Sequence, residues 1–429
     1  MEITTKNKII LKYLAFTACL LVLFSMPVNA LVTWPTGAAP CNDINDIETC
    51  LNGVVNGETI EIAANSIPSQ SGISVSPAKS FTLRAAAGFA PVFSGFTSLY
   101  FTGSDDDITV VIEGLSIEVG NFTAVQGGAG IFDVTFRNNT VEDSSFRSAI
   151  AIRSGNASPP FGPVIFLVEG NILNVEDEEA SAISVGGFIG AGNEGQILNN
   201  RITATNTGQS AVISVSAGSS GMDVDVISNE IFGQNFNVGI GVRLFGTGGL
   251  LNAKLINNVI QGQEGNSGQP GAISLSNSSS GSGHSNFEVV NNTLAFNQRG
   301  ISYGGREDLG ATSNAMFMNN IIAFSSQSGF SIGGDFNATT INDYNLIFGN
   351  ASNFYTPGIN DVEEDPSFIS NIDLRLQQFS PAIDAGLNSA LPASVVYDIN
   401  GNTRIQQIIV DLGAFEAKTD DLIFADGFE

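Results

Sequence analysis

The amino-acid sequence predicts an all-β fold: a right-handed parallel β-helix, or solenoid, with an N-terminal helical cap and a C-terminal capping region. The first observation is an asparagine, followed two positions later by an aliphatic residue, that recurs at steps of 32, 29, 29, 29, 34, 28 and 25 residues. A loosely fixed period between about 20 and 50 residues is typical of solenoids and similar arrays. The repeated asparagines are Asn139, Asn171, Asn200, Asn229, Asn258, Asn292, Asn320 and Asn345.

The second observation is a short segment between successive asparagines in which apolar and small residues alternate. Strict alternation with β-branched residues indicates a strand with one buried face. Helical repeats do not fit this pattern, and left-handed hexapeptide helices repeat after only about eighteen residues per turn. The strands are Ile150–Ile152, Ile183–Val185, Ile213–Val215, Ile240–Val242, Ile273–Leu275, Ile301–Tyr303 and Phe330–Ile332.

Stacking of the coils explains both patterns, because it places equivalent residues about 4.8 Å apart. The aliphatic residues then form one interior column from Val141 to Ile347, and the asparagines form a ladder of side-chain amides. Asparagine in a turn also tolerates the left-handed conformation that sharp corners need. We therefore interpret the repeated asparagines as scaffold and not as ligand-binding residues.

Residues 58–359 are expected to form the solenoid and residues 31–57 its N-terminal cap. An open solenoid end exposes unpaired strand edges and must be covered. Apolar residues from Ile44 to Val55 have helix-like spacing, and Cys41 and Cys50 form a close pair that favours a disulfide in an oxidising compartment. We expect a short helix, stapled by this disulfide, to cover the first coil.

Residues 1–30 are expected to be a secretory signal peptide, with three lysines, an apolar run and small residues before the cleavage site. The chain has 42 acidic and 16 basic residues, a net charge of −26, and removal of Glu2 and three lysines with the signal peptide brings it to −28. Such a surface repels nucleic acid and anionic membranes. No later segment is long and apolar enough to span a membrane.

Residues 360–416 carry motifs that resemble a known family. The motifs are Asp365-Pro366-Ser367-Phe368, Leu374-Arg375-Leu376, Ser380-Pro381-Ala382-Ile383-Asp384-Ala385-Gly386, Asp398-Ile399-Asn400-Gly401-Asn402-Thr403-Arg404 and Val410-Asp411-Leu412-Gly413-Ala414-Phe415-Glu416. This region resembles the choice-of-anchor Q domain, which closes right-handed β-helices of the pectate-lyase-like superfamily on exported bacterial proteins. The resemblance implies a secreted or surface location and no particular activity. Residues 417–429 are an acidic tail, either a sorting tag like those of Gram-negative exported proteins or a frayed terminus.

Candidates for catalysis are few. His284, in a Gly/Ser segment that reads as a loop, is the single histidine, which excludes a site with two imidazoles. Polysaccharide lyases of this fold need an Arg or Lys base and a cation that neutralises the uronate. The densest polar stretch of the solenoid supplies the lyase candidates, which are Arg299, Tyr303, Arg306 and Asp308.

A calcium loop is suggested by Asp398, Asn400 and Asn402, which alternate as oxygen ligands do in such loops. Calcium is accordingly the one cofactor that the sequence suggests. The alternative is a turn capped by these side chains, with Arg404 paired to a carboxylate such as Asp384 or Asp411.

The predicted ligand-binding face consists of the outward positions of the alternating strands, where serine and glycine predominate. A flat face of small residues lets an extended glycan approach closely, but small residues also suit a plain solvated sheet. Two functions stay open: a non-catalytic protein that binds a polysaccharide or a cell-envelope component, and a polysaccharide lyase-type enzyme. The candidate binding residues are Ser184, Ser214, Arg243, Ser274 and Ser302.

Overall fold

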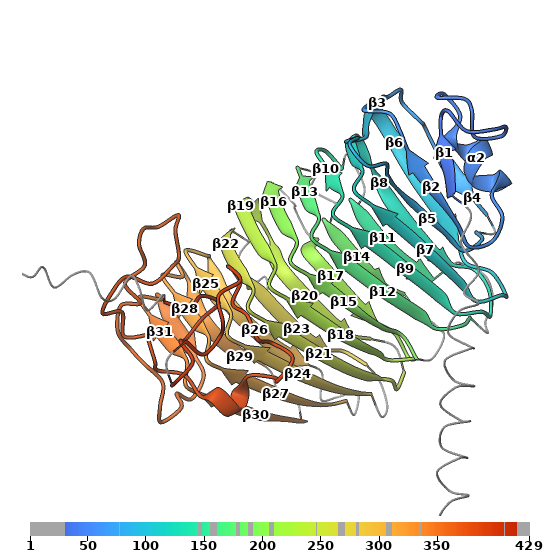
Figure 1. Ribbon diagram of the computed structural model, residues 1–429. Coiled ribbons are helices and arrows are strands. Elements are labelled where there is room, and N and C mark those ends of the chain that lie inside the picture. The colour runs from blue at the N-terminus through green and yellow to red at the C-terminus, as the bar shows by residue number, and fades with distance from the viewer. Residues whose placement is uncertain are drawn as a thin grey trace, which may run out of the picture.

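The computed structural model describes residues 31–417, except residues 77, 145–147, 155–160, 177–180, 188–191, 206–209, 246, 265–270, 280–282, 306–310, 334–336 and 407. The predicted signal peptide and residues 418–429 of the predicted tail therefore lie outside the described residues. Within them the chain forms an all-β parallel solenoid of the right-handed type with about nine turns (Figure 1). The predicted fold class is confirmed.

Three stacks of parallel strands form the sides of the solenoid, and β6 and β8 continue from the second stack into the third. Sheet A consists of β1 (Leu31–Trp34), β2 (Glu58–Ile62), β5 (Phe81–Ala85), β7 (Ile108–Glu113), β9 (Phe132–Arg137), β12 (Val164–Glu169), β15 (Glu194–Leu198), β18 (Met222–Ile227), β21 (Leu250–Ile256), β24 (His284–Val290), β27 (Thr312–Met318) and β30 (Asn337–Asp343). The second stack consists of β3 (Ser66–Ile67), β6 (Val92–Thr102), β8 (Ser116–Gln126), β10 (Thr140–Val141), β13 (Ile172–Val175), β16 (Arg201–Thr205), β19 (Glu230–Phe236), β22 (Val259–Gln263), β25 (Thr293–Ala295), β28 (Ile321–Ala323) and β31 (Leu346–Phe348). The third stack continues from β6 and β8 and adds β4 (Ile73–Val75), β11 (Ile150–Ser154), β14 (Ile183–Gly186), β17 (Ala211–Ala217), β20 (Val238–Leu244), β23 (Ile273–Asn277), β26 (Arg299–Gly305), β29 (Ser328–Gly333) and β32 (Ser352–Phe354).

The predicted ladder of asparagine amides is confirmed at every step from Asn139 to Asn345. Each side-chain amide donates to the side-chain oxygen of the next ladder asparagine, at 2.9–3.2 Å. That oxygen also accepts the preceding asparagine's backbone N–H, as Asn229 Oδ1 does from Asn200 at 3.1 Å. Asp361 stands at the end of the ladder, where its Oδ1 accepts the Asn345 backbone N–H at 2.8 Å and the Asn345 side-chain amide at 3.4 Å.

The left-handed residue of each corner precedes the ladder asparagine, one position earlier than the sequence suggests. These residues have φ between 55° and 65°, and the ladder asparagines are left free to point into the buried turn. Asparagine or glycine occupies most of these positions, as the left-handed conformation favours. The residues are Asn138, Gly170, Asn199, Ser228, Asn257, Asn291, Asn319 and Tyr344.

The N-terminal end carries α2 (Ile47–Gly53), a helix where the sequence predicts one (Figure 1). Asp46 starts it, because its side chain accepts the Thr49 N–H at 2.9 Å. The predicted disulfide between Cys41 and Cys50 is present. Cys50 belongs to the same buried cluster as the first strands. Capping of the first coil by this helix stays a prediction.

The C-terminal region, residues 360–416, contacts the solenoid from its end and from its flank. Val362 pairs with Leu346 of β31 and so covers part of the last coil. The chain then folds back beside β22 to β31 (Figure 1), where Leu412 joins the buried cluster that includes Ile321. Among the described residues of this region, the 3-10 helix η2 (Asn388–Ala390) is the only named element. Its sequence motifs do not reveal this lateral position.

We predict that Asn229→Ala lowers the free energy of unfolding by about 1–3 kcal/mol, the usual cost of unpaired buried polar groups. The change removes the acceptor of the Asn200 N–H and the donor to the Ile197 carbonyl. Urea unfolding measures the effect. The control is Asn174→Ala, which removes only an exposed hydrogen bond to Glu142. Equal stability of the two variants would contradict a structural role for the ladder.

Candidate functional site

An elongated groove of about 1170 Å³ crosses the outer face of sheet A from β9 to β30. Its floor is two rows of outward side chains, and neighbours within a row are direct register partners. The first row is Asp133, Ile165, Glu194, Asp223, Asn252, Asn286, Asn314 and Thr339. The second row is Thr135, Leu167, Gln196, Asp225, Lys254, Glu288, Met316 and Ile341.

Both rows keep a constant spacing from the asparagine ladder in the sequence. Every first-row residue lies six positions before a ladder asparagine, and every second-row residue lies four positions before one. The prediction of a ligand face missed this groove because it rested on the strands that follow the asparagine. The six- and four-residue offsets are the signal in the sequence that points to the groove.

The middle of the first row forms a second ladder of amides, on the surface. Asn314 Nδ2 donates to Asn286 Oδ1 at 2.9 Å, and Asn286 Nδ2 donates to Asn252 Oδ1 at 2.7 Å. Asn252 Nδ2 in turn donates to Asp223 Oδ1 at 2.7 Å. These bonds hold the side chains in a defined orientation. Asn314 Nδ2 also lies 3.3 Å from His284 Nε2, whereas the NH2 groups of Asn252 and Asn286 each have a second N–H that can face a ligand.

His284 extends this polar floor. It is the first residue of β24 and does not lie in a loop, as its Gly/Ser surroundings suggest. Its Nδ1 lies 2.6 Å from Thr312 Oγ1, and its Nε2 lies 2.9 Å from Asn286 Oδ1. The imidazole thus joins the amide ladder as a hydrogen-bonding partner.

The charge of the groove is predominantly negative. Among the described residues, Lys254 is the only basic one that lines it, and Lys254 Nζ lies 3.6 Å from Asp225 Oδ1. Burial raises the pKa of Asp133 above the ordinary value for an aspartate. The groove therefore repels polyanions. Its carboxylates are Asp133, Glu194, Asp223, Asp225 and Glu288.

The four lyase candidates do not form a site in the described structure. Arg306 and Asp308 lie outside the described residues. Tyr303 is 1 % exposed and packs edge-on against Phe287 inside the solenoid, where burial raises its pKa to about 12. This corrects its choice as a catalytic candidate, because a core side chain cannot reach a substrate on the surface. Arg299 Nη2 donates to a glutamine side chain at 2.7 Å.

The predicted serine face lies on the third stack, a different side of the solenoid from the groove. Its rows pair as predicted: Ser184 is the register partner of Ser214, and Ser274 of Ser302. Arg243 Nε donates to a serine hydroxyl at 3.1 Å, and its guanidinium lies 5.4 Å from the centre of a phenylalanine ring. Ligand binding by this face stays a prediction.

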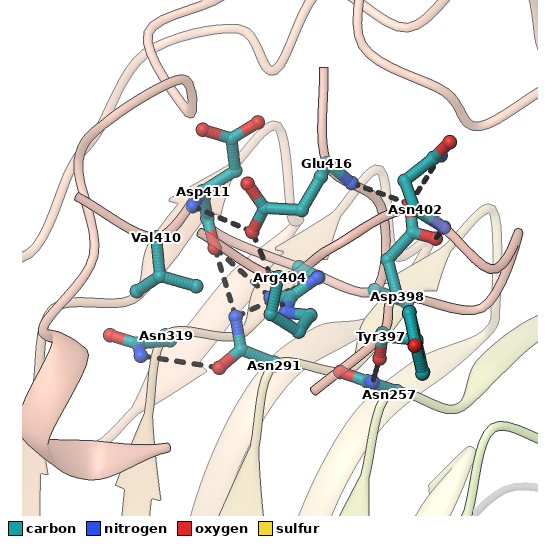
Figure 2. Close-up of polar contacts among 12 residues, drawn as sticks. Asn257, Asn291, Asn319, Tyr397, Asp398, Asn402, Arg404, Val410, Asp411 and Glu416 are labelled. Carbon is teal, nitrogen blue, oxygen red and sulfur yellow. Dashed lines mark hydrogen bonds and ion pairs between the residues drawn. The ribbon is translucent and has the colours of Figure 1, made fainter. Parts of the chain in front are cut away.

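The predicted calcium ligands form a capped turn (Figure 2). Asp398 Oδ1 accepts the backbone N–H of Asn400 at 2.9 Å and of Asn402 at 2.7 Å. Asp398 Oδ2 accepts the Asn402 side-chain amide at 3.0 Å and the Glu416 N–H at 2.9 Å. Donors surround this carboxylate, which supports the capped-turn alternative. In the described part of the chain no cluster of three or more His, Cys, Asp or Glu side chains could hold a metal ion.

Arg404 is buried beside this turn, with 1 % of its side chain exposed (Figure 2). Its Nη2 donates to the carbonyls of Asp411 and Gly413, at 3.3 and 2.9 Å. Its Nε lies 3.5 Å from Glu416 Oε1. The predicted pairing of Arg404 with Asp384 or Asp411 is thus corrected: Glu416 is the ion-pair partner, and Asp411 contributes its carbonyl.

No protein-family model and no curated protein matches the chain. The resemblance of residues 360–416 to the choice-of-anchor Q domain therefore stays a prediction. Within the described residues, no helix has the length and apolar character needed to cross a membrane.

We predict that the C-terminal region loses stability as the pH rises from 5 to 9. Burial raises the pKa of Glu416 to about 9 and that of Asp411 to about 6, although Arg404 opposes both shifts. A carboxyl whose pKa is raised by folding stabilises the native state fully below its unfolded pKa, and this contribution is lost as the pH approaches its folded pKa. At about 1.4 kcal/mol per pKa unit, the loss amounts to a few kcal/mol.

Thermal unfolding of the protein and of Glu416→Gln across this pH range measures the effect. The variant should show a flatter pH profile, because its amide does not titrate. The control is Glu364→Gln, an exposed position of the same region. A melting temperature that stays constant or rises between pH 5 and 9 in the parent protein would contradict the prediction.

Proposed function

We propose that this chain is an exported bacterial protein whose groove on sheet A binds an extended polysaccharide without acidic groups. The observation that carries the proposal is the pair of side-chain rows that repeats at each coil. Stacked strands lie about 4.8 Å apart, close to the advance of one hexopyranose unit along an extended glycan. Successive coils can therefore offer equivalent side chains to successive sugar units.

The side chains of the groove suit the two kinds of contact that sugars make. Amides and carboxylates in the middle of the rows can hydrogen-bond to hydroxyl groups. Ile165 and Leu167 at one end, and Met316 and Ile341 at the other, can contact the C–H faces of sugar rings. A mixture of apolar contacts and a few oriented polar groups is typical of ligand sites.

The charge of the groove favours binding over lyase chemistry. Five carboxylates line it, so a polyuronate substrate is repelled. Lys254, the one base-type residue of the rows, is held near Asp225. Export and bacterial origin rest on the signal-peptide pattern of residues 1–30 and on the resemblance of residues 360–416 to a family of exported proteins. We therefore favour a non-catalytic secreted or surface protein over a polysaccharide lyase.

We predict that Asn286→Trp weakens glycan binding at least tenfold, about 1.4 kcal/mol, because a large side chain obstructs the centre of the groove. Ser214→Trp, an equal obstruction on the serine face, is the matched control and should bind as the parent does. Affinity electrophoresis with β-glucan, mannan, dextran, chitosan and polygalacturonate measures binding, and circular dichroism checks the fold.

The experiment also distinguishes the groove on sheet A from the serine face as the binding site. Loss of binding in Ser214→Trp alone would assign the site to the serine face. Binding of polygalacturonate in preference to the neutral glycans, or release of unsaturated products from it, would support the lyase alternative. Failure of the parent protein to bind any glycan of the panel would refute the proposed function.

A further inference from the structure

A smaller hollow of about 620 Å³ adjoins the groove and lies between sheet A and the C-terminal region. Gln196 and Asp225 line both of them, so the two are neighbours on the surface. Leu198 and Ile227 line the hollow on the solenoid side. Residues 394–399 and Gly401 line the other side. Segments about 200 positions apart in the sequence thus form one surface.

Tyr397 is the aromatic residue of this hollow, and it is 58 % exposed. An exposed aromatic ring beside a polar groove is a binding feature, since aromatic side chains bury much apolar area at little cost in rotamer freedom. Asn199 and Ser228, both at left-handed corners of the solenoid, line the same hollow with polar side chains.

The backbone of Tyr397 is held rigidly, although its side chain is exposed. Tyr397 and Thr403 form an antiparallel bridge, and the Arg404 N–H donates to the Val396 carbonyl at 3.0 Å. Asn257 of the solenoid donates its side-chain amide to the Tyr397 carbonyl at 2.9 Å (Figure 2). The bond from Asn257 fixes the tyrosine relative to the coils that bear the groove.

We propose that Tyr397 is the platform on which one neutral sugar unit of the bound glycan stacks, which makes the C-terminal region a part of the binding site. This inference rests on the proposed glycan-binding function of the groove. A pyranose ring presents C–H bonds on its face and hydroxyls at its edge. Tyr397 covers the face, and Asn199, Gln196 and Asp225 accept or donate hydrogen bonds at the edge.

The first test compares Tyr397→Ala with Tyr397→Phe and with Phe379→Ala. Phe379 is an 85 % exposed aromatic residue of the same region and does not line the hollow. We expect Tyr397→Ala to weaken binding of β-glucan, mannan or dextran at least tenfold, and the other two variants to bind nearly as the parent does. Equal binding by Tyr397→Ala and the parent overturns the platform and leaves the groove intact as a site.

The second test is spectroscopic and separates stacking from a merely structural role. Trp34 is the single tryptophan and is fully buried, so Tyr397→Trp adds one exposed fluorophore at the platform. Addition of the bound glycan should shift its emission to shorter wavelength, with no shift in the parent protein. Glycan binding without any emission change in Tyr397→Trp would refute stacking. Absence of binding in the parent protein would instead refute the proposed function of the groove.

Discussion

The buried asparagine ladder is the interaction on which the rest of the structure depends. Each amide is tied to the coil after it and to a backbone carbonyl of the coil before it, as Asn229 is to Asn258 and to Ile197. A coil that slipped by one residue would leave these buried groups unpaired, which costs more than their pairing contributes. The ladder therefore determines the register of the whole solenoid, and with it the columns of the core and of the surface.

The groove follows from this register. Steps between ladder asparagines vary from 25 to 34 residues, whereas the offsets from the ladder to the two groove rows are constant at six and four. Variation in length is thus confined to the remainder of each coil. Sheet A and the corner beside it repeat without insertions, so side chains such as Asn252, Asn286 and Asn314 lie close enough to form a continuous surface ladder.

Features that depend on repetition were predictable from the sequence, and features that depend on contacts between distant segments were not. The ladder, the Cys41–Cys50 disulfide and the pairing of the serine rows follow from local spacing and are confirmed. The alternation of residues in β26 also places Tyr303 on the buried side of the strand, with Ile301. The prediction of Tyr303 as a catalytic residue did not take this alternation into account. The placement of Tyr397 beside the groove has no local signal in the sequence, because it requires residues 394–401 to fold back onto β15 and β18.

Arg404 joins two segments of the C-terminal region: its backbone N–H donates to the Val396 carbonyl, and its side chain donates to the carbonyls of Asp411 and Gly413. A buried arginine is costly to desolvate, and burial raises the pKa of the neighbouring Glu416 to about 9, so their contact is a poor source of stability at neutral pH. Arg404 and Asn291 donate to the same two carbonyls, of Asp411 and Gly413, and thereby join the C-terminal region to the coils. The ladder from Asn139 to Asn345 consists of asparagine amides, which do not titrate, so a rise in pH leaves its hydrogen bonds in place while it acts on this junction. We infer that glycan affinity falls between pH 5 and 9, because loosening of the C-terminal region displaces Tyr397 from the groove. An affinity that stays constant over this range while the C-terminal region loosens would show that Tyr397 does not contribute to binding.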